Sequence, residues 1–307
     1  MRYDIRRVTK MDEVRAVVEL TRQIWSMSEK ECPSAYLMKA VTRFGLVLAA
    51  YSPHTSPPAP PVGFIYSLPK NSNSHHSHMM GVHPDHQHRG LGFELKRAHR
   101  RWALDHDPPI STIEWTFDPL IAPNAYLNLR KLGGFSNTFL PDYYGFSDDS
   151  TIYPALPTDR ILIEWSLKHP RVVRRLESAP SGQEVEQPVA SVEDLFHWAP
   201  VLTAFNAKSP LLSPPAVISQ HLAKLLDEPF VAVEVPSSFV KDTTVAHQSW
   251  GMDWRSFFKV ICEHFFGHGF YLADYFSFSE KALVETNSVN KRRNFFLYVR
   301  NIHDYQY

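Results

Sequence analysis

The first half of the chain alternates between two hydrophobic periodicities. Apolar side chains at every second position predict strands, and apolar side chains every three or four positions predict amphipathic helices. Turn-forming residues, such as the Pro- and Ser-rich stretch 52–61, separate these segments. The predicted elements are strand 3–8, helices 11–26 and 33–43, strands 46–51, 62–68 and 77–82, helix 91–106, strand 111–117, helix 124–132 and strand 160–167.

A polar stretch, residues 169–190, interrupts this pattern before it resumes. The later part predicts helix 192–204, strand 230–235, helix 254–266 and strands 271–276 and 295–299. We therefore predict an α/β (α+β) protein in three parts. The first is a domain over residues 1–168, the second a linker over 169–190, and the third a C-terminal α/β lobe over 191–307.

Composition narrows the class of protein. Thirty-two basic and 32 acidic residues give a net charge of zero, and 44% of residues are hydrophobic. A nucleic-acid partner usually requires a basic field, and a membrane span requires about 18 consecutive apolar residues. We expect no nucleic-acid partner and no membrane association. Two cysteines and a start without an apolar signal core favour a reducing, cytoplasmic location. The oligomeric state stays open.

The segment 81–92, Gly-Val-His-Pro-Asp-His-Gln-His-Arg-Gly-Leu-Gly, lies between a predicted strand and a predicted helix. A chain that turns into a helix leaves backbone N–H groups unpaired, and these groups with the helix dipole form an anion site. Glycine at positions 90 and 92 lets a phosphate approach the backbone closely. The spacing is neither that of a Walker loop nor that of a dinucleotide fingerprint.

This segment resembles the cofactor motif of the GCN5-related N-acetyltransferase (GNAT) superfamily, which Gln87, Gly90 and Gly92 match. The resemblance implies the GNAT fold, a mixed central sheet flanked by helices, and acetyl-CoA or another acyl-CoA as co-substrate. It also implies that the fourth strand separates from the fifth and pairs with the pantetheine arm. The cofactor-binding residues implied are Met80, Gly81, Val82, Gln87, His88, Arg89, Gly90, Leu91 and Gly92.

Segments 77–82, 115–120, 124–128, 131–133 and 143–145 resemble a subgroup of predicted acetyltransferases that carry a C-terminal extension. The extension is interpreted as a lobe, in one version a degenerate GNAT-like half. The resemblance implies that the backbone amide of Val82 stabilises the oxyanion. Asn124 and Asn128, four residues apart on one helix face, are expected to contact the pantetheine arm. The alternatives are capping for Asn124 and solvent exposure for Asn128.

The reaction needs a base for the amine and an acid for the thiolate. Many family members have a glutamate four residues before the valine, and His78 stands there, on the same strand face as Val82. Asp118 is the second candidate base. The alternatives are packing for His78 and a turn or cap role for Asp118. The tyrosine that usually acts as general acid in the family is replaced by Leu129. Tyr126 is therefore the candidate acid, with Tyr143 and Tyr144 as further options.

Two charged groups have plainer interpretations. Six histidines between positions 75 and 88 could suggest zinc, but no cysteine or carboxylate with ligand spacing accompanies them, so we expect no metal. The basic run 96–101 is interpreted as a solvated helix face, or alternatively as a contact for a nucleotide phosphate.

The sequence thus predicts an N-acyltransferase that moves an acetyl or other small acyl group from acyl-CoA to a primary amine of a small molecule. One alternative is a CoA-binding sensor or scaffold without catalysis. Another is a transferase of the same fold that takes its acyl group from a carrier protein or a charged tRNA.

Overall fold

A computed structural model describes residues 3–53, 59–145, 156–177, 188–202, 222–236, 245–279, 292–305 and 307. Within it, the side chains of residues 245–251 are not described. The chain forms two compact units, and each combines segments that are distant in the sequence. The first unit contains Met1–Trp115 and Glu164–Glu184, and the second contains Thr116–Ile163 and Val185–Tyr307.

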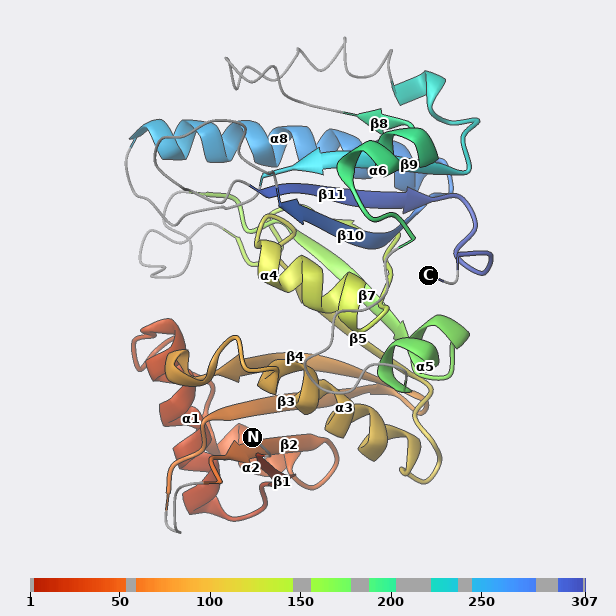
Figure 1. The fold of residues 1–307 in the computed structure, drawn as a ribbon. Coiled ribbons are helices and arrows are strands. Elements are labelled where there is room, and N and C mark those ends of the chain that lie inside the picture. The colour runs from red at the N-terminus through yellow and green to blue at the C-terminus, as the bar shows by residue number, and fades with distance from the viewer. Residues whose placement is uncertain are drawn as a thin grey trace. The chain divides into compact units, whose positions relative to one another are not determined.

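The first unit is built on a mixed sheet with helices on both faces (Figure 1). Strands β1 to β4 form an antiparallel meander, and β4 then pairs in parallel with β5. The elements are β1 (Asp4–Arg7), α1 (Met11–Trp25), α2 (Ala35–Val41), β2 (Leu46–Tyr51), β3 (Gly63–Asn71), β4 (Ser74–Val82), η1 (Pro84–His86), α3 (Leu91–Leu104), the start of β5 (Thr112–Phe117), the end of β7 (Arg160–Ser166) and α5 (Pro170–Glu177).

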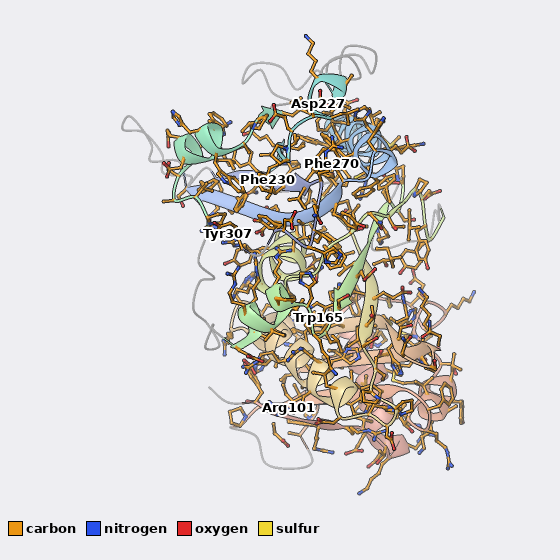
Figure 2. All side chains as sticks on the ribbon, turned by 90° about the vertical axis from the view of Figure 1, so that its right-hand side faces the viewer. Arg101, Trp165, Asp227, Phe230, Phe270 and Tyr307 are labelled. Carbon is orange, nitrogen blue, oxygen red and sulfur yellow. The ribbon has the colours of Figure 1, made fainter. Side chains whose placement is uncertain are left out.

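Two hydrophobic layers cover this sheet. On one face, α1 and α2 pack over Phe64 and Tyr66 of β3. On the other face, Leu91 and Leu95 of α3 pack over Ile65 of the same strand. Alternation along β3 sends neighbouring side chains into different layers, as a two-sided buried sheet requires. Trp165 of β7, labelled in Figure 2, is fully buried and meets Trp115 of β5 edge to face at 5.6 Å.

The second unit has its own sheet, with strand order β10-β11-β9-β8. The β10–β11 and β11–β9 pairs are antiparallel, and β8 is parallel to β9. The elements are the end of β5, α4 (Ala122–Ala125), the π-helix η2 (Tyr126–Lys131), β6 (Phe139–Leu140), the start of β7, α6 (Val192–Trp198), β8 (Val201–Leu202), β9 (Phe230–Val235), α8 (Val245–Gly267), β10 (Tyr271–Ser279) and β11 (Arg292–Val299).

Buried ion pairs connect the two segments of the second unit. Arg130 of η2 donates to Asp274 of β10 at 2.7 Å, and the hydroxyl of Tyr305 donates to the same carboxylate at 2.7 Å. A backbone bridge between Ser136 and Leu272 lies beside this pair. The stretch 116–163 therefore packs with the C-terminal segment, whereas the sequence assigned it to the N-terminal domain.

Most sequence-based elements are present in the structure with boundaries that differ by a few residues. The expected helix 192–204 is an exception, because it ends at Trp198 and Val201–Leu202 form strand β8. Helix α8 begins at Val245, well before the expected start at residue 254. Part of the expected linker 169–190 is helix α5, whose Val172 and Leu176 are buried in the first unit. Residues 178–187 of that stretch, and 203–204 of the expected helix 192–204, lie outside the described residues. Among the described residues, no helix is long and apolar enough to cross a membrane.

Candidate functional site

The turn between β4 and α3 exposes a row of backbone amides. Gly90 has a φ of 80°, and His88 a φ of 57°, so the chain turns through the left-handed region before α3 begins. Among the described residues, the amides from His88 to Gly92 have no hydrogen-bond acceptor, and a Cβ added at Gly90 would meet nothing within 4 Å. These amides and the N-terminal end of the α3 dipole fit a pyrophosphate. Arg89 is exposed beside them.

Gln87 holds this turn against the strand. Its side-chain amide donates to the carbonyl oxygen of Val82 at 3.0 Å, and its backbone N–H donates to Pro84 at 3.2 Å. These two bonds hold the turn in one conformation, so the amides that follow keep their orientation without a ligand. Gln87 therefore fixes the shape of the turn.

Strands β4 and β5 separate after only three paired positions. Ser74 to His76 pair with Thr112 to Glu114, and among the described residues the ladder ends there. The amide of His83 donates to Val62 at 2.9 Å, so strand alternation directs the amides of Met80 and Val82 away from β3, toward the edge that β5 has left. This open edge is where the resemblance expects a pantetheine arm to pair.

Gly81 has a packing reason to lack a side chain. A Cβ at this position would lie 2.7 Å from Ile24 and 2.8 Å from Phe64, both of which belong to the layer under α1. Contacts this short require a shift of packed core groups. The glycine therefore keeps the end of α1 close to β4.

A β-bulge in β4 overturns the expected orientation of His78. Met79 pairs with Tyr66 and Ser77 pairs with Ser67, so His78 is the extra residue. Its ring meets Tyr66 edge to face at 5.5 Å, on the α1 and α2 face, whereas Val82 packs on the α3 face. The prediction that His78 and Val82 share one face is wrong, because a bulge shifts the two-residue alternation by one position.

His78 keeps solvent access. Its side chain is exposed, and desolvation by the surrounding chain, followed by the neighbouring His76, lowers the pKa of its imidazole. A lowered pKa leaves the imidazole neutral at pH 7, which is the form that accepts a proton. The assignment of His78 as a base stays a prediction.

Sequence analysis did not select His76, which the structure places beside a carboxylate. His76 and Glu114 occupy the last paired position before β4 and β5 separate, and Nδ1 of His76 lies 3.4 Å from Oε1 of Glu114. The other oxygen of Glu114 accepts from Lys70 at 2.6 Å. The β4–β5 register brings this pair together, and that register cannot be derived from either strand alone.

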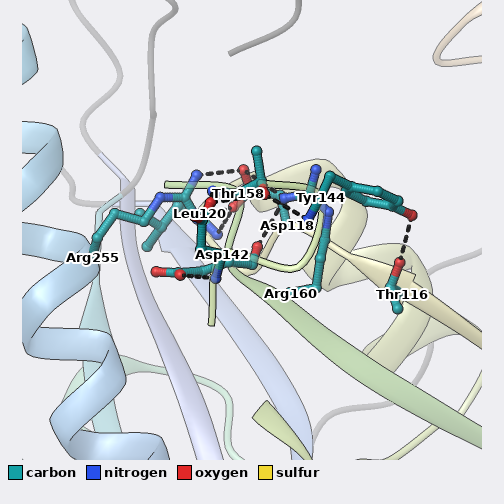
Figure 3. A network of polar contacts seen from close by, with 9 residues as sticks. Thr116, Asp118, Leu120, Asp142, Tyr144, Thr158, Arg160 and Arg255 are labelled. Atoms are coloured by element: carbon teal, nitrogen blue, oxygen red, sulfur yellow. Dashed lines mark hydrogen bonds and ion pairs between the residues drawn. The ribbon is translucent and has the colours of Figure 1, made fainter. Parts of the chain in front are cut away.

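Asp118 is enclosed in an ion-pair network of the second unit (Figure 3). Arg255 of α8 donates to both of its oxygens, at 2.9 and 2.7 Å, and the guanidinium of Arg160 lies 3.9 Å away. The amide of Leu120 donates to the same carboxylate at 3.0 Å, which forms an Asx-type turn. This geometry favours the structural role that the sequence left as an alternative.

The predicted helix 124–132 divides into α4 and the π-helix η2. Asn124 is exposed and Asn128 is buried. The alternative of a solvent-exposed Asn128 is therefore wrong, and a contact of either asparagine with the pantetheine arm stays a prediction. Tyr126 is half-buried beside Lys131, and Leu129 is fully buried, so a core side chain stands where the family has its tyrosine. Tyr143 and Tyr144 are exposed.

Lys96 corrects the interpretation of the basic run. Its side chain is only 2% exposed, its amine donates to Ser77 at 3.1 Å, and it lies 3.4 Å from the ring centre of Trp115. Among the described residues, no carboxylate pairs with it. Desolvation alone holds the pKa of this amine well below its ordinary value. His99, one helical turn later, is fully buried.

The histidines of segment 75–88 do not form a metal centre in the part of the chain that is described, where no three metal-ligating side chains converge. His75 and His76 point to opposite faces, since His75 contacts Trp102 of α3 at 5.1 Å. Burial, and to a smaller extent His106, lowers the pKa of His75 to about 4.

The family model described as the acetyltransferase (GNAT) family matches residues 14–121. Similar solved structures include the ribosomal-protein-S18-alanine N-acetyltransferase of Escherichia coli, at 16% identity over 54% of this chain and 94% of that chain, with a TM-score of 0.41. Another is the IAA acetyltransferase of Bacillus cereus, at 17% identity over 53% and 98%, with a TM-score of 0.39. No curated protein matches the sequence at a significant level.

The matched residues, 14–121, include strand β4, the turn before α3 and α3 itself. This match supports an acyl-CoA-dependent N-acyltransferase whose co-substrate is acetyl-CoA or another acyl-CoA. The amide row from His88 to Gly92, the left-handed Gly90 and the open edge of β4 are the features of this chain that fit such a co-substrate.

Proposed function

We propose that this protein transfers an acetyl or other small acyl group from acyl-CoA to a primary amine of a small molecule. The observation that carries the proposal is the free amide row from His88 to Gly92, directly after a strand whose outer edge is unpaired. The amides would hold the pyrophosphate, and the edge of β4 would hold the pantetheine arm. Bound acyl-CoA supplies an activated thioester.

In this proposal, two residues of β4, Val82 and His78, have different roles in the reaction. The amide of Val82, which points to the open edge, donates to the carbonyl oxygen as it becomes negative. His78 accepts the proton of the amine, directly or through one water molecule, from the face opposite α3. The pantetheine arm would occupy one side of the thioester and the acceptor the other.

Binding of CoA can be tested by thermal shift and calorimetry. We expect CoA at about 100 times its dissociation constant to add about 2.7 kcal/mol of stability. Gly90→Val should abolish this shift, because its side chain would enter the space in front of the amides. Gly269→Val is the matched control, since Gly269 has the same φ of 80° and also has nothing within 4 Å of its added Cβ.

The acceptor is tested by following release of the CoA thiol with a panel of small primary amines and, separately, with peptides that have a free N-terminus. Turnover with small amines and none with peptides supports the proposal. Turnover with peptides alone would replace the small molecule by a polypeptide acceptor.

Leu129 favours a second candidate, a CoA-binding module without catalysis, because a buried leucine stands at the position of the acidic tyrosine. Tight CoA binding without thiol release from any acceptor would favour this candidate over the transferase.

A further inference from the structure

The β4–β5 fork carries an imidazole–carboxylate pair on its α1 and α2 face, and the proposed reaction so far gives this pair no role. Nδ1 of His76 lies 3.4 Å from Glu114, and the ring of His76 lies 6.3 Å from that of His78, centre to centre. The side chains of His76 and Glu114 are 23% and 17% exposed, so both are partly buried and still accessible to solvent.

The bulge at His78 creates this arrangement. Both His76 and His78 lie on the face opposite α3, while Ser77 between them bonds to Lys96 of α3. The pairing of β4 with β5 fixes Glu114 beside His76 on that face, at the last position where the strands are joined. The result is a row of Glu114, His76 and His78 that runs from the closed end of the fork toward its open edge.

We propose that this row is a proton relay, in which His78 takes the acceptor proton and passes it to His76, whose imidazolium Glu114 stabilises. This inference rests on the proposed acyl transfer. As the amine nitrogen bonds to the acyl carbon and the C–S bond breaks, the N–H proton moves to a ring nitrogen of His78. The thiolate leaves and takes a proton from solvent. The proton on the imidazole pair reaches solvent through His76.

The charges around the row explain its direction. A carboxylate beside Nδ1 fixes the tautomer of His76 and leaves its other ring nitrogen, Nε2, as the proton acceptor. A proton that His76 receives from His78 lies beside the Glu114 carboxylate, which stabilises the positive charge. Once the proton has moved on, His78 is neutral again and can accept the next proton. The other groups that face the row are Tyr66 and Lys70 of β3, and Lys70 is bound to Glu114.

Glu114→Gln is the central test, because it keeps the shape and removes the charge. We expect kcat/KM to fall by about 10²-fold, in the range of a lost proton-transfer aid, with CoA affinity unchanged. The acid limb of the pH–rate profile should move to lower pH, since the imidazole pair loses its carboxylate. Lys70→Met, which removes the cation beside Glu114, should move the same limb to higher pH. A Glu114→Gln variant with the rate and pH profile of the wild type would overturn the relay.

NMR titration of the histidine rings separates this inference from the proposed function. If CoA binds but no acceptor is acylated, the proposed acyl transfer is rejected. The interactions within the histidine row can then still be tested by the titration alone. The relay predicts that His76→Asn raises the pKa of His78, because the neighbouring His76 is one of the causes that lower it. It also predicts that Glu114→Gln changes the ring signals of His76, because the carboxylate beside Nδ1 is lost. Unchanged ring signals in both variants would refute the relay even in an active enzyme.

Discussion

Buried cationic side chains occur in both compact units, but their surroundings differ. In the second unit, Arg255 forms two hydrogen bonds with Asp118, and Arg130 pairs with Asp274 at 2.7 Å. In the first unit, Lys96 is as deeply buried, yet among the described residues its amine contacts a serine hydroxyl and the face of Trp115, with no carboxylate paired to it.

The difference follows from the chemistry of the two side chains. An arginine stays protonated in any protein environment, so a buried arginine needs a carboxylate. A lysine can release its proton when burial penalises the charge, and the pKa of Lys96 is shifted in that direction. The arginine pairs thus act as a fixed framework in the second unit, whereas Lys96 lies on the α3 face of the fork and pairs with no anion in the part of the chain that is described.

The largest effect is expected at Asp118. Asp118→Asn removes the negative charge that accepts two hydrogen bonds from the buried Arg255, and Arg160 at 3.9 Å is a second cation beside it. We expect a loss of up to about 5 kcal/mol in the free energy of unfolding, measured by urea denaturation. The double variant Asp118→Asn/Arg255→Met should be less destabilised than the sum of the single variants by about 1–3 kcal/mol.

The same variant tests the role of Asp118 in chemistry. At low temperature, where Asp118→Asn stays folded, the pH dependence of kcat/KM should match that of the wild type, because the carboxylate is already engaged by Arg255. A variant of normal stability that loses one ionisation from the profile would instead make Asp118 the base.

A smaller loss is expected at Asp274, where one arginine and the Tyr305 hydroxyl share the carboxylate. Asp274→Asn keeps an acceptor oxygen, so we expect a loss of about 3 kcal/mol in the same denaturation experiment. The control is Glu234→Gln, since Glu234 pairs with the partly exposed Arg293 and should cost no more than about 1 kcal/mol. Equal losses in the two variants would contradict the distinction between buried and partly exposed pairs.

Local patterns in the sequence predicted much of the fold. Strands β2 and β9 were placed at their observed bounds, and the apolar face of the long helix α8, from Trp254 to Phe265, is buried as expected. Periodicity succeeds here because each element buries one continuous face. It did not reveal that Thr116–Ile163 packs with the C-terminal segment, since the pair Asp118–Arg255 joins residues 137 positions apart.

The candidate site was predictable where it depends on backbone conformation. The sequence predicted a turn into α3 with unpaired backbone amides at residues 81–92, and the structure shows such a turn, with Gly90 in the left-handed region. The orientation of His78 was missed, because alternation assumes a regular strand and a bulge leaves no clear mark in one sequence. The burial of Lys96 was missed for a related reason. A run of basic residues indicates a solvated helix face, and this helix turns one of them inward toward Ser77.

The smallest and most specific effect is expected at Lys96. Because the folded-state pKa of its amine lies below the ordinary value of the unfolded chain, unfolding takes up a proton at any pH between the two values. The stability of the wild type should therefore rise with pH across that window, by up to about 1.4 kcal/mol per pH unit for one proton. Lys96→Met fills a similar volume without a charge, so it should lack this slope and be more stable by about 1 kcal/mol at pH 7.

The gain in stability from Lys96→Met should shrink as pH rises toward the ordinary lysine pKa. Near that pH the amine of the wild type is neutral in the unfolded chain as well as in the folded protein, so burying it no longer requires the loss of a proton. Lys96→Arg is the matched control: it keeps a donor for Ser77 but cannot release its proton, so it should be less stable than the wild type at every pH. Urea denaturation at several pH values measures all three proteins. Two results together would contradict this prediction. The free energy of unfolding of the wild type would change with pH no more than that of Lys96→Met, and Lys96→Arg would be as stable as the wild type. The amine of Lys96 would then be charged and paired with an anion.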